Sequence, residues 1–210
     1  MSKQSQQPHI CKVVLLGESG VGKTSIISQF IENEFYEFLT STTGAQFSTK
    51  TVAFDKYNKS IDFEIWDTAG QERFRAMSRI FYKDAAIAIL VYDITREESF
   101  NELKSYWVDE LRENASKDII IGFAANKSDL FEKEKVNENE ARAYAQSLNA
   151  VFEPTSAKDR NGIDELFMEV GEKYLKTIGL DQDQKKSRKK IAKDDGNGEG
   201  DNQKKKNDCC

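Results

Sequence analysis

Apolar residues gather along the chain in short runs that predict the strands of a sheet. Residues 12–16 form one such run, and residues 85–92 and 118–125 are almost continuously apolar. Continuous runs are expected of strands that are buried on both faces of a parallel sheet. Residues 151–155 predict a last, short strand, and Pro154 favours the edge of the sheet because proline has no amide proton to donate.

Between these runs the pattern changes to a hairpin and several helices. Two strands, at 47–54 and 60–66, are expected to pair as an antiparallel hairpin across a polar turn. Apolar residues with helical spacing predict helices at 25–32, 95–111, 138–148 and 162–177, and a charged, irregular helix is expected at 73–83.

Capping signals mark two of these helices. Thr95 and Glu98 have the spacing of a capping box, and Asn137 and Glu140 are candidate cap partners for the next helix. Trp107 keeps helical spacing with other apolar residues, so we predict that it is part of the core rather than a ligand contact.

This order of elements predicts an α/β fold, with a six-stranded, mostly parallel sheet and helices on both of its faces. One strand, from the hairpin, would be antiparallel. The 210 residues, of which 38% are hydrophobic, suffice for one domain with a single core. We expect a flexible leader at 1–10, the domain at 11–177 and a disordered tail at 178–210, since the tail has almost no apolar side chains.

Charge and cysteine usage exclude several classes of protein. The formal net charge of −5 gives no reason to expect a surface for nucleic acid. No run approaches the length of a membrane span, and the N-terminus has no apolar signal-peptide core. Cys11 is expected to be a small buried hydrophobe, and His9 is expected to be exposed. With the other two cysteines at the very end of the chain, neither a disulfide framework nor a metal site is predicted, so a reducing cytosolic setting is expected.

Residues 17–24, GESGVGKT, fit the phosphate-binding pattern G-x-x-x-x-G-K-[ST]. The glycines let the backbone curl so that successive amide N–H groups point at phosphate oxygens. Lys23 would reach the β- and γ-phosphates, and the Thr24 hydroxyl would ligate magnesium. A strand before the loop and a helix after it supply the context that the motif requires, whereas the alternative is a simple glycine-rich turn.

Further polar motifs directly follow other predicted strands, at 67–71, 126–129 and 156–158. Ligands of such sheets bind outside the carboxyl ends of the strands, so these loops are expected to converge. The Asp129 carboxylate can accept hydrogen bonds from both N1–H and the exocyclic amine of guanine. Adenine offers no such donor pair and would leave the carboxylate unpaired. A guanine nucleotide is therefore predicted.

The motifs GESGVGKT, STTG, WDTAGQE, NKSD and TSAK have the order and spacing of the Ras superfamily of small GTPases, which the chain resembles over residues 10–177. WDTAGQERF, YDITREESF and the terminal Cys-Cys are similar to the Rab family, and FYEFLTSTTGAQF, FEIWDTAGQE and TREESF to its endosomal, Rab five-like branch. The resemblance implies the P-loop NTPase G-domain fold. It also implies a slow GTPase that switches with its nucleotide and recruits effectors in vesicle and endosomal traffic.

The resemblance assigns roles to residues in each loop. The implied nucleotide-binding residues are Ser19, Gly20, Val21, Gly22, Lys23, Thr24, Ser25, Phe35, Thr42, Gly70, Asn126, Lys127, Asp129, Ser156, Ala157 and Lys158. Phe35 would pack against guanine, Lys127 would lie along it, and the Gly70 amide would contact the γ-phosphate. A magnesium ion would be held by Thr24, Thr42 and, through water, Asp67. Gln71 would orient the attacking water as the catalytic residue.

Two residues depart from or complicate this pattern. Thr43 stands where the family usually has isoleucine, so the hydroxyl of either Thr42 or Thr43 could meet the metal, although spacing favours Thr42. Ser19 would lie close to the γ-phosphate, with an effect on hydrolysis whose direction the sequence does not give. No arginine finger in cis is evident, so an activating protein is expected to add about 10³–10⁵ in rate.

The resemblance also implies partners and a location. Phe47, Trp66 and Phe81 match an aromatic triad that reads effectors, with ordinary core packing as the alternative, and Cys209 and Cys210 match a doubly geranylgeranylated terminus. The implied partners are an exchange factor, a GTPase-activating protein, a GDP-dissociation inhibitor, a prenylation escort and transferase, and tethering effectors of a monomeric switch. It would act in the cytoplasm and on the cytoplasmic face of early endosomes or endocytic vesicles. A metabolite kinase or ATPase and a GTP-binding scaffold that does not hydrolyse are the other classes considered.

Overall fold

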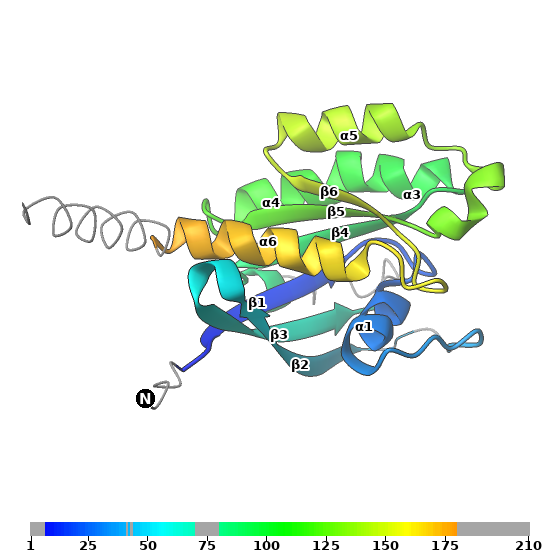
Figure 1. Cartoon of the computed structure of the whole chain (residues 1–210). Coiled ribbons are helices and arrows are strands. Elements are labelled where there is room, and N and C mark those ends of the chain that lie inside the picture. The colour runs from blue at the N-terminus through cyan, green and yellow to red at the C-terminus, as the bar shows by residue number, and fades with distance from the viewer. Residues whose placement is uncertain (1–6, 41, 43, 70–79, 180–210) are drawn as a thin grey trace, which may run out of the picture.

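The computed structural model describes residues 7–40, 42, 44–69 and 80–179. Within them, six strands form one sheet in the order β2-β3-β1-β4-β5-β6 (Figure 1). Their bounds are β1 His9–Leu16, β2 Ala45–Phe54, β3 Lys59–Thr68, β4 Ile87–Asp93, β5 Ile120–Asn126 and β6 Val151–Thr155. Only the β2–β3 pair is antiparallel, and the other four pairs are parallel. The predicted fold class is confirmed.

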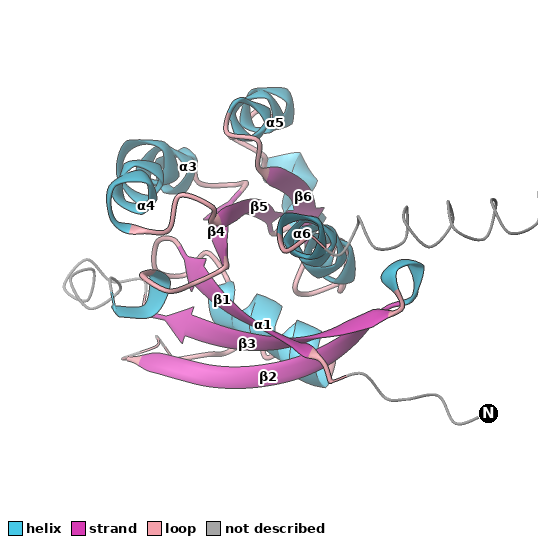
Figure 2. Ribbon diagram, turned by 90° about the vertical axis from the view of Figure 1, so that its left-hand side faces the viewer, coloured by secondary structure: helices cyan, strands magenta, loops and turns pink. Residues whose placement is uncertain are grey.

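Helices cover both faces of this sheet. Their bounds are α1 Lys23–Glu32, α3 Glu97–Glu102, α4 Val108–Asn114, α5 Glu138–Ser147 and α6 Ile163–Thr177, with short 3₁₀ helices η1 Asp55–Tyr57 and η4 Ser128–Lys133. The α1 and α6 helices pack on one face, and α3, α4 and α5 pack on the other (Figure 2). A π-helical turn, η3 Leu103–Trp107, joins α3 to α4.

The second half of β1 shows why residues 13–16 are continuously apolar. Val13 and Leu15 pack with α1 and α6, whereas Val14 and Leu16 pack with the helices of the opposite face. All four side chains are fully buried, and each contributes about 1.5–3 kcal/mol by leaving water. Trp107 is buried in the second of these clusters, as predicted.

The edge position of β6 and the antiparallel hairpin also agree with the predictions from the sequence. The β6 strand, which contains Pro154, pairs on one side only, with β5. The predicted hairpin is the β2–β3 pair, in register from Ala45 opposite Thr68 to Phe54 opposite Lys59.

Several details differ from the sequence-based expectation. The predicted capping box of Thr95 and Glu98 is wrong. The N-cap of α3 is Arg96, whose side chain makes no capping hydrogen bond, and Thr95 donates to Asp93 instead. The cap of α5 is confirmed, since the Asn137 side chain accepts from the Glu140 amide. His9 was predicted to be exposed but is half-buried in β1, so the last two residues of the expected leader, 9 and 10, belong to the sheet.

Other predictions touch residues outside the described parts of the chain. The expected helix at 73–83 lies mostly outside them, as does the expected tail at 178–210. None of the helices in the described ranges is long and apolar enough to cross a membrane. Cys11 is buried, as predicted, and burial raises the pKa of its thiol to about 12.

Candidate functional site

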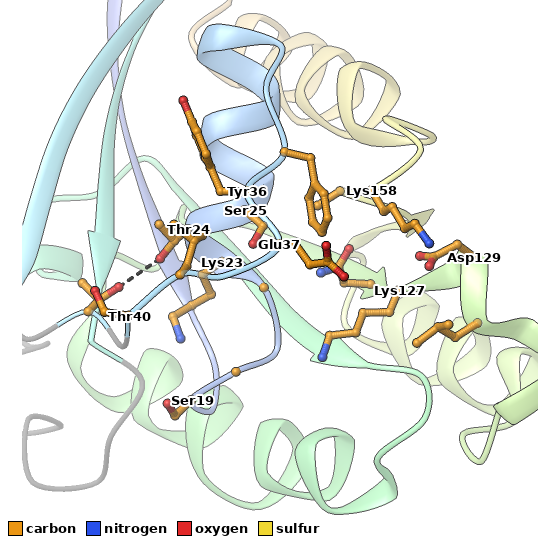
Figure 3. A pocket seen from close by; sticks show the side chains of 18 of the residues that line it. Ser19, Lys23, Thr24, Ser25, Tyr36, Glu37, Thr40, Lys127, Asp129 and Lys158 are labelled. Atoms are coloured by element: carbon orange, nitrogen blue, oxygen red, sulfur yellow. Dashed lines mark hydrogen bonds between the residues drawn. The ribbon is translucent and has the colours of Figure 1, made fainter.

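A cavity of about 820 Å³ opens where the loops after β1, β5 and β6 meet the loop before β2 and the last residue of β3, Thr68 (Figure 3). Its lining residues are Ser19, Gly20, Gly22, Lys23, Thr24, Ser25, Phe35, Tyr36, Glu37, Leu39, Thr40, Thr42, Thr68, Asn126, Lys127, Asp129, Leu130, Ala157 and Lys158. The predicted convergence is therefore observed for the loops after β1, β5 and β6, while residues 70 and 71 of the motif at 67–71 lie outside the described residues. The volume is in the range of cavities that hold small ligands.

The loop at 17–24 has a backbone that requires glycine. Gly17 has a φ of 141° and Gly22 a φ of 100°, in a region that favours glycine. A side chain on Gly22 would place its Cβ 2.2 Å from Nδ2 of Asn126. The α1 helix begins directly after this loop, with no acidic residue in its first turn. Its N-terminal amides and dipole therefore face the cavity without a competing carboxylate.

Lys23 is held inside this loop. Its Nζ donates to the carbonyl oxygens of Gly17 at 2.8 Å and Glu18 at 2.9 Å, and the side chain is buried. Burial lowers the pKa of Lys23 to about 8, against the opposing pull of nearby carboxylates such as Asp67. An anion in the cavity would favour the charged form of this amine and compete with the carbonyls for its protons.

Three oxygen-bearing side chains meet next to Lys23, at the same end of the cavity (Figure 3). The Thr24 hydroxyl donates to Oδ2 of Asp67 at 2.6 Å, and it lies 2.9 Å from the Thr42 hydroxyl. Because a hydroxyl has one proton to give, Thr42 is the donor in the second bond. Asp67 is buried, and burial raises the pKa of its carboxyl, an effect that the hydrogen bonds from Thr24 and Thr42 oppose.

This cluster fits a hard divalent cation. Oδ1 of Asp67 is buried without a hydrogen-bond partner among the described residues, and a buried carboxylate oxygen left in that state is costly. Magnesium prefers oxygen ligands, keeps several waters and uses only one or two carboxylates. The described residues contain no group of three or more His, Cys, Asp or Glu side chains that could form a richer metal site. The donor set of Thr24, Thr42 and Asp67 thus matches magnesium better than a transition metal.

The loops after β5 and β6, which are predicted to bind the base, are hydrogen-bonded to one another and to the phosphate loop. Asn126 donates from Nδ2 to the Val21 carbonyl at 2.7 Å and accepts from the Thr155 hydroxyl at 3.2 Å. The Ser156 hydroxyl donates to Asp129 at 2.7 Å. Asn126 therefore holds the phosphate loop against the base loop, a role that its motif alone did not reveal.

A model of the Ras family matches residues 12–176 of the chain. The chain belongs to the Ras family. Among curated proteins it is similar to "Ras-related protein Rab-22A" from Homo sapiens and from Mus musculus, each 48% identical over 166 residues, or 79% of this chain and 84% of the relative. The Rab-22A of Canis lupus familiaris is 48% identical over 159 residues, or 76% of this chain and 80% of the relative.

The predicted Rab resemblance is confirmed by these relatives. As a Rab-type member of the Ras family, the chain binds GTP and GDP and hydrolyses GTP, and it acts with regulators and effectors. This identity excludes the metabolite kinase or ATPase, and the scaffold that does not hydrolyse, which the phosphate loop alone left open.

The structure places the predicted site residues of this GTPase in three groups. Most line the cavity directly. Three do not line it: Val21 and Ser156 are buried and are hydrogen-bonded to Asn126 and Asp129, and the buried Asp67 is hydrogen-bonded to Thr24. The third group lies outside the described residues and comprises Gly70, Gln71, Cys209 and Cys210.

Sequence reasoning missed several residues of the site. Tyr36, Glu37, Leu39 and Thr40 line the cavity, and they come from the loop between α1 and β2, in which only Phe35 and Thr42 had been assigned roles toward the nucleotide. Gln29 was missed entirely. Its Nε2 donates to the carbonyl of Ala157 at 2.9 Å, so α1 fixes the loop after β6. No motif marks Gln29, because its contact partner is 128 residues away in sequence.

The three aromatic residues predicted to read effectors lie in a row. The ring centroids of Phe47 and Trp66 are 5.1 Å apart, and those of Trp66 and Phe81 are 5.2 Å apart. Phe47 is 51% exposed, and the other two side chains are half-buried. Trp66 and Phe81 also pack against the core on this face of the sheet, so the row is a partly exposed aromatic surface that is continuous with the core.

Proposed function

We propose that this Rab GTPase is a nucleotide-dependent switch of endosomal vesicle traffic, with its guanine nucleotide bound in the cavity described above. The observation that carries the proposal is the union, in one cavity, of the phosphate loop, the Thr24–Thr42–Asp67 cluster and the NKSD loop. The endosomal setting is supported by the similarity to Rab-22A and by the similarity in sequence to the Rab five-like branch.

Each end of the cavity would hold one part of the nucleotide. The amides of Ser19–Ser25 and the amine of Lys23 would bind the phosphates, while Asp129 would accept from guanine and Phe35, 38% exposed on the cavity wall, would pack against the base. Lys127, Ala157 and Lys158 would complete the base pocket. Thr24 and Thr42 would hold a magnesium ion, with Asp67 behind them, and the ion when bound neutralises charge on the phosphates.

The switch would depend on residues that sense the γ-phosphate. Thr42 already contacts Thr24, so the loop before β2 is in reach of the phosphate end of the cavity. The Gly70 amide would bind the γ-phosphate, and Gln71 would orient the attacking water. Loss of the γ-phosphate releases both loops in such switches. The row Phe47–Trp66–Phe81 would then present a different surface to effectors.

The remaining parts of the chain would attach the switch to membranes. We propose a G domain at 11–177 and a tail at 178–210 that is geranylgeranylated on Cys209 and Cys210 by an escort and a transferase. A GDP-dissociation inhibitor would extract the monomeric GDP form into the cytoplasm. An exchange factor, a GTPase-activating protein and tethering effectors would act on the cytoplasmic face of early endosomes or endocytic vesicles.

Replacing the proposed catalytic glutamine tests this function. In the Gln71→Leu variant we expect GTP binding within about twofold of wild type and hydrolysis slowed by about tenfold or more, because an apolar side chain cannot orient water. The measurement is phosphate release in a single turnover. Gln146→Leu, on an exposed position of α5, is the matched control and should hydrolyse at the wild-type rate. Unchanged release by Gln71→Leu would refute the assigned role.

A further inference from the structure

The turn between β4 and α3, residues 93–96, touches both halves of the nucleotide site. None of the described residues that line the cavity comes from this turn. Asp93 nevertheless pairs in register with Asn126, the first residue of the NKSD motif, and the Ile94 amide donates to the Asn126 carbonyl at 3.1 Å. The turn is therefore joined to the base loop before any side-chain contact is considered.

Asp93 reaches the base loop through its side chain. Its carboxylate is 2% exposed, and Oδ2 lies 2.7 Å from Nζ of Lys127. The other oxygen accepts from the Thr95 amide at 2.9 Å and from the Thr95 hydroxyl at 2.7 Å. Lys127 has a φ of 65°, an unfavourable conformation for a residue with a side chain. The ion pair therefore constrains a residue whose own backbone preference would not keep it in place.

Arg96 reaches the phosphate loop from the other end of the turn. One guanidinium nitrogen donates to the carboxylate of Glu18, and another donates to the carbonyl of Ser19 at 3.2 Å. These two residues belong to the loop whose amides face the phosphates. The turn itself is closed by a bond from the Arg96 amide to the Asp93 carbonyl at 2.9 Å, and the Asp93 amide donates to the Ser99 hydroxyl.

We propose that Asp93 and Arg96 are positioning residues that brace the base loop and the phosphate loop from behind and thereby set how tightly the nucleotide is held. The inference rests on the proposed nucleotide site. Neither residue touches the cavity, so each would act through a residue of a loop, Asp93 through Lys127 and Arg96 through Glu18 and Ser19. The charged hydrogen bonds of the buried Asp93 contribute more than the part-exposed pair of Arg96.

The division of labour gives a signature that general destabilisation would not produce. Arg96→Met releases only the phosphate loop, so it should weaken binding of GDP more than binding of GMP, which has one phosphate fewer. Asp93→Asn keeps the shape of the side chain but loses the ion pair with Lys127, so it should weaken both nucleotides equally. A variant that merely loosened the fold would weaken both nucleotides alike, and a GDP-specific effect at Arg96 would exclude it. At Asp93 the distinction comes from the ion pair with Lys127. Combining Lys127→Met with Asp93→Asn should weaken both nucleotides no more than Lys127→Met alone, whereas a general loosening would add to its effect.

Competition binding of GDP and GMP against a fluorescent GDP analogue, with the full chain in excess magnesium, tests the proposal. For Arg96→Met we expect GDP to bind about threefold more weakly and GMP to bind as in wild type. For Asp93→Asn we expect both to bind about tenfold more weakly. Combining Glu18→Gln with Arg96→Met should weaken GDP no more than Arg96→Met alone, since both changes remove the same pair.

Matched controls come from an exposed ion pair on α4. Arg112→Met and Asp109→Asn make the same chemical changes at a pair 3.4 Å apart, and both should leave GDP and GMP binding unchanged. If wild type failed to bind GDP, the proposed site would be refuted. If wild type bound GDP while Asp93→Asn and Arg96→Met matched the controls, the bracing role would be refuted. Equal weakening of GDP and GMP by Arg96→Met would also refute it.

Discussion

At the position of Thr24, one hydroxyl connects three segments of the chain. Thr24 is the second residue of α1, and its hydroxyl donates to Asp67 near the end of β3 and accepts from Thr42 in the loop before β2. The contact with Thr42 supports its choice over Thr43, which lies outside the described residues. A side chain with this many partners tolerates few replacements, because each partner is part-buried and would lose a hydrogen bond.

Replacing this hydroxyl should shift the nucleotide preference. Thr24→Asn removes the hydroxyl that would ligate magnesium, and GTP depends on the metal more than GDP because it carries one more phosphate. We expect the variant to bind GDP about tenfold or more in preference to GTP, measured by competition against a fluorescent nucleotide. Thr24→Ser keeps the hydroxyl and serves as the control. Equal affinity of Thr24→Asn for GDP and GTP would contradict the metal role.

Motif residues such as Lys23, Thr24 and Asp129 were predictable from sequence because their chemistry is encoded in local spacing. The cavity brings them together as expected. Gln29 and Arg96 were not predictable, because each acts on a loop that becomes its neighbour only in the folded chain. Asn126 was predicted to read the base, but its bonds to Val21 and Thr155 depend on strand register, which sequence spacing did not supply.

At the scale of elements, strands and helices were predicted well where apolar runs were long. The failures concern local hydrogen bonding. Thr95 was expected to cap α3, but its hydroxyl and amide both turn back to the carboxylate of Asp93. The helix expected at 95–111 contains the π-helical turn Leu103–Trp107, for which the apolar spacing gave no signal.

The packing of α6 against the hairpin provides a stability prediction at this scale. A Cβ on Gly171 would lie 2.3 Å from Cζ of Phe54 and 3.0 Å from Cζ of Phe63. Gly171→Ala should therefore lower the free energy of unfolding by about 1–3 kcal/mol through overpacking, despite the better helix propensity of alanine. Urea denaturation of the GDP-bound protein measures the change.

Gly44→Ala is the control for this substitution, because nothing lies within 4 Å of a Cβ there. It should leave the midpoint of unfolding nearly unchanged. If Gly171→Ala were as stable as the control, the close packing of α6 on Phe54 would not limit this position.

At the scale of the whole molecule, the cavity lies at the carboxyl ends of the parallel strands. The end of α6 lies at their opposite, amino ends (Figure 1). Tyr174, near the end of α6, donates to the carbonyl of Ile10 at the start of β1, at 3.0 Å. The last described residues after α6 therefore lie on the side opposite the cavity. A membrane anchor at the end of the tail would leave the cavity open to regulators.

Removing the proposed anchor should release the protein from membranes. We expect the Cys209→Ser and Cys210→Ser double variant to be recovered in the cytosolic fraction of cells that express it, because no lipid chain remains to bind the bilayer. The single variants should show intermediate retention, since one chain alone binds reversibly. Cys11→Ala changes a thiol within the core and should leave the distribution as in wild type. Membrane recovery of the double variant equal to wild type would refute lipidation as the anchor.

Because Cys11 is buried, labelling of the folded protein with maleimide can report on the terminal cysteines. Cys11 is 1% exposed, and its raised pKa keeps it as an unreactive thiol at neutral pH. A maleimide added to the folded protein therefore meets no reactive thiol in the described part of the chain. Geranylgeranylation would convert a cysteine thiol to a thioether, which does not react with maleimide. The number of thiols that react therefore reports directly how far Cys209 and Cys210 have been modified.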